Sequence, residues 1–250
     1  MSMFQNFKTE DDGVKSGGDV VGGYTLFDSD VYEGIVKLVF FGKAQSSNAQ
    51  FAEITVDVDG KELRERIYFT NRDGANTYTD KKTGETKFLP GFETVNDLAL
   101  VTTGYGLVDL EDQIDQKTVK IYDYEQKKDL PQNVPCLIPV MGQPVMVAVI
   151  KQTVDKQKKN DATGSYENTG ETREENVISK FFHAETKRTV NEIKSGIETP
   201  VFLDKWLEKN KGEVINRAKG ADGNSGAPGR NSGGKKTGTS PTKTSGLFGS

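Results

Sequence analysis

The stretch Ala52–Thr70, AEITVDVDGKELRERIYFT, contains the clearest structural signal in the chain. Apolar side chains occupy the even positions of Ala52–Val58, an alternation typical of a strand with one buried face. Asp59-Gly60 follows, and this dipeptide favours the two-residue turn of a β-hairpin. The stretch therefore predicts a hairpin with an apolar inner face. The opposite face of its return strand carries Arg64, Arg66 and Tyr68.

Further strands are predicted on both sides of this hairpin from apolar alternation or continuous apolar runs. They span Tyr32–Gly42, Thr118–Tyr124, Val134–Met141, Val145–Val154 and Asn176–Phe182. The turn-rich segment 71–91 predicts a second, smaller hairpin around Lys82-Thr83-Gly84. Residues 155–175 form a polar insertion that is long for a plain connector, so we expect it to be functional or disordered.

Helix-start signals occur at three places. Thr94-Val-Asn-Asp97 and Thr189-Val-Asn-Glu192 match the capping box, in which a hydroxyl residue precedes an acid by three positions. Gly104 is a stop signal for the first of these helices. Thr199-Pro200 is expected to open a last helix. One face of that helix would carry Phe202, Leu203, Trp206 and Leu207.

These elements predict a mainly β fold with one helix between the third and fourth strands and helices at the end. A closed or partly open Greek-key barrel satisfies this order, and the oligonucleotide-binding (OB) barrel is the commonest fold of that description. A β-sandwich remains an alternative, because the strand count is compatible with both. We expect a flexible arm over 1–19, the OB-fold domain over 20–217, and a Gly/Ser/Lys-rich disordered tail over 218–250.

Composition excludes several classes of protein. The richest apolar stretch, Leu137–Ile150, is short and contains two Pro and a Gly, so no membrane span is expected. The first residues lack the apolar core of a secretion signal. One cysteine rules out an internal disulfide, and one histidine rules out His-rich metal sites. We therefore expect a soluble cytoplasmic protein without a metal or cofactor.

Motifs for catalysis are weak. Gly229–Lys235 satisfies G-x-x-x-x-G-K, but Lys236 follows where a phosphate loop needs Ser or Thr. The acids between Asp109 and Asp115 lack the spacing of a calcium loop, so a solvated face is the simpler interpretation. A catalytic role for His183 would need a nucleophile and an orienting acid placed around it, and the sequence gives no sign of such an arrangement. Cys136 lies in an apolar stretch and is expected to be buried and inert. The sequence predicts no enzyme.

Cations and aromatic rings recur together, which is the combination that single-stranded nucleic acid requires. Alternation groups Lys37 with Phe41 on one strand, and Lys120, Tyr122 and Tyr124 on another. The full candidate set is Lys37, Phe41, Arg64, Arg66, Tyr68, Arg72, Tyr78, Lys81, Lys82, Lys87, Phe88, Lys120, Tyr122 and Tyr124. The alternative is an ordinary solvated sheet face whose cations pair with acids across strands.

Five segments resemble a family of bacteriophage single-stranded DNA-binding proteins. They are Gly23–Lys37, Ile67–Arg72, Lys87–Asp97, Asn176–Phe182 and the helix around Trp206, which together span residues 20–215. The resemblance implies an OB barrel that coats replication or recombination intermediates in the infected bacterial cytoplasm, without sequence preference and without catalysis. The candidate set would then be its DNA-binding face. A β-rich phage structural protein of the virion is the main rival, and a nuclease using the acids of 109–115 is a third hypothesis.

The tail departs from the pattern of this family, in which many members end in an acidic segment with a terminal aromatic residue that recruits replication partners. Here residues 218–250 contain five basic residues and one acidic residue, so the tail carries a net charge of +4 and the rest of the chain carries −8. Leu247 and Phe248 would still offer a docking tip for phage or host replication proteins. We expect the basic residues to add weak phosphate contacts.

Deletion of residues 218–250 therefore should weaken binding of single-stranded DNA and reduce its dependence on salt, because several cations are lost. Fluorescence anisotropy with labelled poly-dT at two salt concentrations measures both effects. Unchanged or tighter binding by the truncated protein would contradict the expectation.

Overall fold

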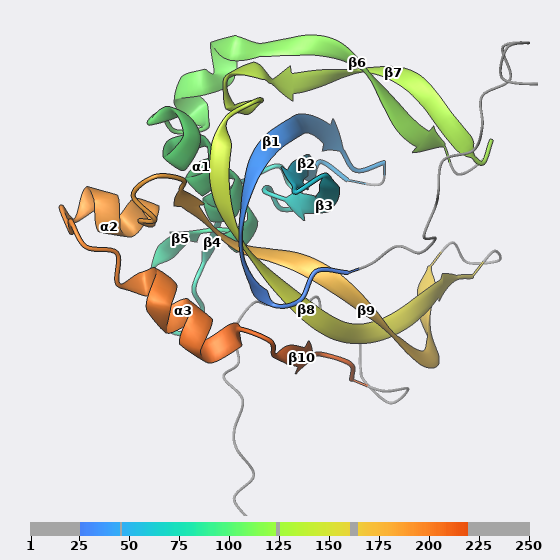
Figure 1. Ribbon diagram of the computed structural model, residues 1–250. Helices are drawn as coiled ribbons and strands as arrows, with labels where there is room; N and C mark the ends of the chain where they lie inside the picture. Colours follow the sequence, from blue (N-terminus) through green and yellow to red (C-terminus); the bar gives the residue numbers. More distant parts are fainter. Residues whose placement is uncertain (1–25, 46, 124–125, 161–164, 220–250) are drawn as a thin grey trace, which may run out of the picture.

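A computed structural model of the chain describes residues 26–45, 47–123, 126–160 and 165–219, and shows a mainly β architecture (Figure 1). The strands are β1 (Asp30–Lys43), β2 (Gln50–Val58), β3 (Lys61–Tyr68), β4 (Thr77–Thr79), β5 (Thr86–Phe88), β6 (Ile114–Asp123), β7 (Lys128–Leu137), β8 (Pro144–Lys159), β9 (Tyr166–His183) and β10 (Val214–Asn216). The helices are α1 (Pro90–Thr103), α2 (Val190–Lys194) and α3 (Phe202–Asn210), with 3-10 turns η2 (Val108–Gln113) and η3 (Ile138–Val140). The expected arm 1–19 and nearly all of the expected tail lie outside the described residues.

β1 is shared between two parts of the sheet. Its first half, Asp30–Ile35, pairs antiparallel with β8, and its second half pairs antiparallel with β2. Gly34 lies next to the point where β1 changes its pairing partner from β8 to β2, and a Cβ there would come within 2.6 Å of the Asp57 carbonyl oxygen. The absence of a side chain lets β1 curl tightly against β2, as the blue ribbon of Figure 1 shows.

Eight strands belong to one sheet, in the order β10-β8-β1-β2-β3, with β9 on β8, β7 on β1 and β6 on β7. All these pairs are antiparallel except β10 with β8. No backbone ladder joins β3 to β9 in the described part of the chain, so the sheet does not close into a barrel. Across this opening, the Glu65 carboxylate accepts a hydrogen bond from the Ile178 backbone N–H.

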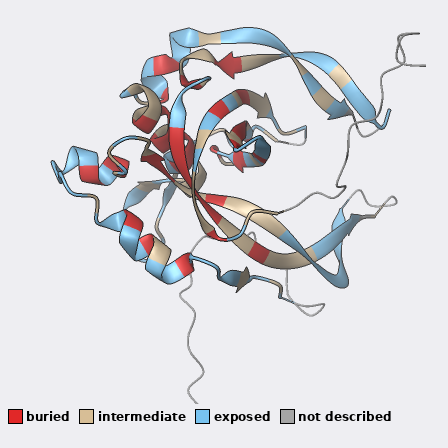
Figure 2. Cartoon of the chain, viewed as in Figure 1, coloured by how far each residue is buried: buried red, intermediate tan, exposed pale blue. Residues whose placement is uncertain are grey.

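The core lies where β1, β2, β3, β8 and β9 meet α1. Ile54, Val95, Leu137 and Phe181 are each essentially inaccessible to solvent. Figure 2 shows the buried residues gathered at this junction, whereas the far ends of the β6–β7 and β8–β9 hairpins are mostly exposed. The two hairpins project to the same side of the molecule in Figure 1.

Helix α1 begins five residues earlier than the sequence predicted, because its cap is Leu89 and not Thr94. Pro90 occupies its first turn, where the fixed φ of proline favours helix initiation. Thr94 is therefore not a cap but an interior residue, and its hydroxyl donates to the Pro90 carbonyl at 2.9 Å. Asp97 contacts Lys180 of β9 at 2.5 Å instead of the helix end. The predicted stop is confirmed, because Gly104 has a left-handed φ of 80°.

The polar insertion 155–175 extends the β8–β9 hairpin. Pairing between the two strands continues as far as Lys159 opposite Tyr166. Exposed ion pairs such as Lys156–Glu171, at 2.7 Å, lie across this arm. A segment expected to be functional or disordered therefore forms paired strands over residues 155–159 and 166–175, where cross-strand charge pairs and backbone hydrogen bonds replace apolar alternation.

Glu192 organises the C-terminal helices. The predicted capping box is confirmed, with Thr189 and Glu192 hydrogen bonded reciprocally at the start of α2. The other carboxylate oxygen of Glu192 accepts from the backbone N–H groups of Val201 and Phe202, each at 2.8 Å. It thereby supplies the anion at the start of α3, which has no side-chain cap of its own. Leu203 and Trp206 of α3 are buried, whereas Phe202 is 42% exposed.

The first stability prediction concerns Gly91, at the start of α1. A Cβ there would lie 1.9 Å from the Tyr68 carbonyl oxygen. Gly-to-Ala changes inside helices ordinarily stabilise by about 1 kcal/mol, but this contact should make Gly91→Ala destabilising by about 2–3 kcal/mol. Urea unfolding followed by Trp206 fluorescence measures it. Gly84→Ala, in an open turn with a φ of 74°, is the control and should cost only about 1 kcal/mol. A stabilised Gly91→Ala protein would refute the close approach.

The second stability prediction concerns the pH dependence of the free energy of unfolding. Burial acts to raise the pKa of Glu192, but hydrogen bonds from Thr189, Val201 and Phe202 outweigh it and leave the pKa below its usual value. The carboxylate therefore stabilises the fold above the unfolded-state pKa, and this contribution disappears as the pH falls through the lower folded-state pKa. Glu192→Gln should lower the free energy of unfolding by about 1–3 kcal/mol at pH 7.

The difference from the unmodified protein should shrink on acidification, as measured by urea unfolding at a series of pH values. Glu198→Gln, at an exposed position in the following loop, provides the control and should leave the curve unchanged. Parallel pH curves for Glu192→Gln and the unmodified protein would show that this carboxylate does not act as described.

Candidate functional site

The outward side of the β2–β3 hairpin collects rings and charges. Its turn is the expected one, with left-handed φ values of 51° at Asp59 and 80° at Gly60. The turn fixes the register, which places Phe51 opposite Tyr68 and Glu53 opposite Arg66. We call this surface the β2–β3 face. It comprises Phe51, Glu53, Glu62, Arg64, Arg66 and Tyr68, together with Lys37, which reaches it from β1.

A row of planar groups crosses this face. The Phe51 and Tyr68 rings meet edge to face with centroids 5.7 Å apart, and the Arg66 guanidinium lies 4.2 Å from the centre of the Phe51 ring. The far end of the Phe51 ring lies over Gly42, where a Cβ would come within 2.3 Å of it. Tyr68 is 49% exposed, so its ring is accessible for stacking.

Every cation on the β2–β3 face has a carboxylate partner. Arg66 donates through Nε and Nη2 to one oxygen of Glu53, at 2.9 and 2.7 Å. Glu62 lies between Lys37, at 2.5 Å, and Arg64, at 2.9 Å. The hydrogen bond from Lys37 lowers the pKa of Glu62, and Glu62 raises the pKa of Lys37. The cation of each pair is half exposed to water, although Glu53 is only 16% exposed, so each cation can exchange its partner.

The segment between β3 and α1 divides its candidates between two sides of a small hairpin. Tyr78 and Lys87 lie opposite each other on β4 and β5, and Lys87 contacts Asp80 at 2.9 Å, which lowers the pKa of that acid. Phe88 has the opposite parity, and its ring packs against Phe92 with centroids 5.0 Å apart. The remaining candidates of this segment are exposed, namely Arg72, Lys81 and Lys82.

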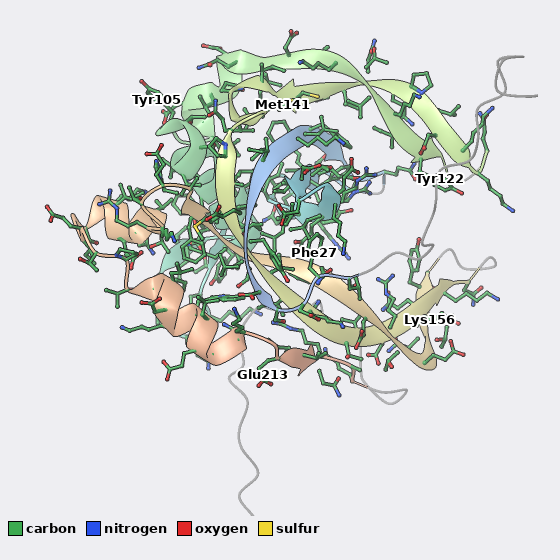
Figure 3. The ribbon with its side chains drawn as sticks, viewed as in Figure 1. Phe27, Tyr105, Tyr122, Met141, Lys156 and Glu213 are labelled. Atoms are coloured by element: carbon green, nitrogen blue, oxygen red, sulfur yellow. The ribbon has the colours of Figure 1, made fainter. Side chains whose placement is uncertain are left out.

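The β6–β7 hairpin carries a separate group of candidates. Lys120 and Tyr122 are exposed on β6, and Tyr124 lies outside the described residues. Figure 3 shows Tyr122 on the projecting arm, at the opposite side of the view from Tyr105. The structure therefore distributes the sequence-predicted set over a central face, a small hairpin and an arm, rather than on one continuous strand face.

Phe41 does not share a face with Lys37, which corrects the prediction from strict alternation. A bulge between Val36 and Leu38 shifts the register of β1 against β2. As a result Phe41 packs against the core, with its ring edge to face with Phe69 at 5.6 Å. Lys37 stays exposed and points to Glu62.

Three members of the β2–β3 face are absent from the sequence-predicted set: Phe51, Glu53 and Glu62. A signal for them exists in the sequence. A two-residue turn at Asp59-Gly60 makes residue numbers of facing positions add up to a constant, which already pairs Phe51 with Tyr68 and Glu53 with Arg66. The acids that hold these arginines are Glu62 for Arg64 and Glu53 for Arg66.

The weak catalytic candidates acquire structural roles. Asp109 accepts a hydrogen bond from the Gly106 N–H, and His183 Nδ1 accepts one from the Thr186 N–H. Cys136 is buried, and burial raises the pKa of its thiol. Among the residues that the structure describes, no group of three or more His, Cys, Asp or Glu side chains is arranged to hold a metal ion. Within the same ranges, no helix has the length and apolar character to cross a membrane.

Comparison with known proteins adds no family assignment. No protein-family model matches the sequence, and no curated protein matches it either.

Proposed function

We propose that this chain binds and protects single-stranded DNA without sequence preference and without catalysis, during phage DNA replication or recombination. It would act in the cytoplasm of the infected bacterium. The observation that carries the proposal is the β2–β3 face, where an exposed Tyr68, a Phe51 ring and three cations share the solvent side of one hairpin. Bases stack on such rings and phosphates contact such cations, irrespective of sequence.

The order of elements supports an OB fold as the finer description. Strands β1, β2 and β3 form a meander, α1 follows, and β8 returns to pair with β1 before β9 completes the second hairpin. This is the connectivity of a five-stranded Greek-key barrel that is partly open. In this proposal the opening lies between β3 and β9, and the β6–β7 hairpin is an insertion. Among the described residues, eight of the ten strands belong to one sheet and β4 and β5 form only a small hairpin, whereas a β-sandwich packs two sheets face to face.

The distribution of charge supports a local binding surface. Outside the tail the chain carries −8, so it cannot attract a polyanion over its whole surface. A strand of DNA would instead follow the cations of the β2–β3 face. Lys120 and Tyr122 on the projecting β6–β7 arm would extend that path. The tail residues Leu247 and Phe248 lie outside the described residues, and their docking to replication proteins remains part of the proposal.

The test is titration with fluorescein-labelled dT oligonucleotide and with duplex of equal length, at two salt concentrations. The protein should prefer the single strand and lose affinity as salt rises. Tyr68→Ala should weaken binding by about 1–3 kcal/mol, roughly 5- to 150-fold, because a stacked base loses its ring. Tyr105→Ala is the matched control, since Tyr105 is 63% exposed and follows the end of α1, outside the β2–β3 face.

Absence of binding to either nucleic acid would refute the function, and assembly of the pure protein into particles would support a virion component instead. Cleavage of the oligonucleotide in the presence of a divalent metal would support a nuclease. Equal losses for Tyr68→Ala and Tyr105→Ala would place the binding surface elsewhere.

A further inference from the structure

Glu53 holds Arg66 in a position that blocks the ring row. Both hydrogen bonds from Arg66 go to the same carboxylate oxygen of Glu53, and they fix the guanidinium 4.2 Å from the centre of the Phe51 ring. A base cannot stack on that side of Phe51 while the guanidinium covers it. One ion pair thus occupies both groups that a nucleotide would need, the cation for its phosphate and the ring for its base.

Glu62 pairs with the other two cations of the face, Lys37 and Arg64. Its two carboxylate oxygens contact Lys37 and Arg64 separately, at 2.5 and 2.9 Å. A carboxylate that bridges two cations resembles a phosphate in charge and in its acceptor oxygens. The exposed fractions of the three cationic side chains lie between 47% and 56%, so a phosphate can reach them from solvent.

We propose that Glu53 and Glu62 are built-in competitors of the DNA phosphates, and that they regulate affinity at the β2–β3 face. This inference rests on the proposed function and identifies a control of the same site. When DNA binds, phosphates replace the two carboxylates, and Arg66 moves from Phe51 to a phosphate. That movement frees the ring for a base, so phosphate contact and stacking become available in one step.

The exchange has a consequence for salt dependence. A phosphate that takes a cation from a glutamate releases counterions from the DNA, but the freed carboxylate takes up a cation from solution. Net counterion release is therefore smaller than the number of phosphate contacts implies. Without the carboxylates the same contacts should give tighter binding and a steeper salt slope.

The experiment compares Glu53→Gln, Glu62→Gln and the double variant with the unmodified protein, by anisotropy with labelled dT oligonucleotide across a range of salt. Each single change should tighten binding about two- to fivefold, because an ion pair made by a half-exposed cation no longer has to be broken. The salt slope should become steeper, by up to about 0.7 per carboxylate. Glu111→Gln, an identical change of charge at an exposed position on η2, is the control and should leave both quantities unchanged.

A second comparison separates competition for Arg66 from simple repulsion of DNA by Glu53. Arg66→Met removes the cation, and Glu53→Gln is then added to that variant. Competition predicts that Glu53→Gln tightens binding only when Arg66 is present, whereas repulsion predicts the same gain in both backgrounds. Thermal unfolding of each variant, compared with the unmodified protein, establishes that the fold is retained.

The outcomes distinguish the two proposals. Gains for Glu53→Gln that vanish in the Arg66→Met background, with Glu111→Gln unchanged, support competition. Unchanged affinity of Glu53→Gln and Glu62→Gln, while the unmodified protein binds DNA, overturns this inference and leaves the proposed function intact. Failure of the unmodified protein and of all variants to bind DNA overturns both.

Discussion

The fold depends on the ability of one strand, β1, to pair with two hairpins. β1 pairs with β8 through its first half and with β2 through its second, and the carbonyl of Asp57 approaches Gly34 too closely for a side chain at that position. If β1 stayed straight, the β2–β3 and β8–β9 hairpins could not enclose a common core with α1. The solvent side of β2–β3 is then fixed by default, because its other side is buried in that core.

The local signals of the sequence predicted the elements that local chemistry determines. The hairpin at Asp59-Gly60 and the capping box at Thr189 need only neighbouring residues, and both are present in the structure. The start of α1 differed because Thr94 and Asp97 match a capping pattern, but Thr94 bonds to Pro90 within the helix and Asp97 pairs with Lys180 of β9. The bulge in β1 could not be predicted for a related reason. Alternation counts residues along one strand, and it cannot detect an extra residue that has no counterpart on the partner strand.

The candidate site shows the same division between local and distant information. Alternation correctly put Arg64, Arg66 and Tyr68 on the outward side of β3, but it does not say what stands beside them. Their partners are on β2 or two residues along the same strand. Only the register across the turn connects Phe51 and Glu53 with them, and the bend of β1 brings Lys37 to Glu62.

The pairing of its cations with carboxylates would let an acidic chain hold a polyanion reversibly. A cluster of unpaired arginines binds phosphates strongly and also binds other anions. In the β2–β3 face each cation already has a carboxylate partner. A phosphate that replaces this carboxylate therefore gains only the difference in free energy between its own contact and the carboxylate contact. Stacking on Tyr68, which is half exposed, does not suffer this cancellation, because no ion pair has to be broken to reach that ring. Discrimination between a single strand and other polyanions would then come from the exposed bases, which a duplex keeps inside its own stack.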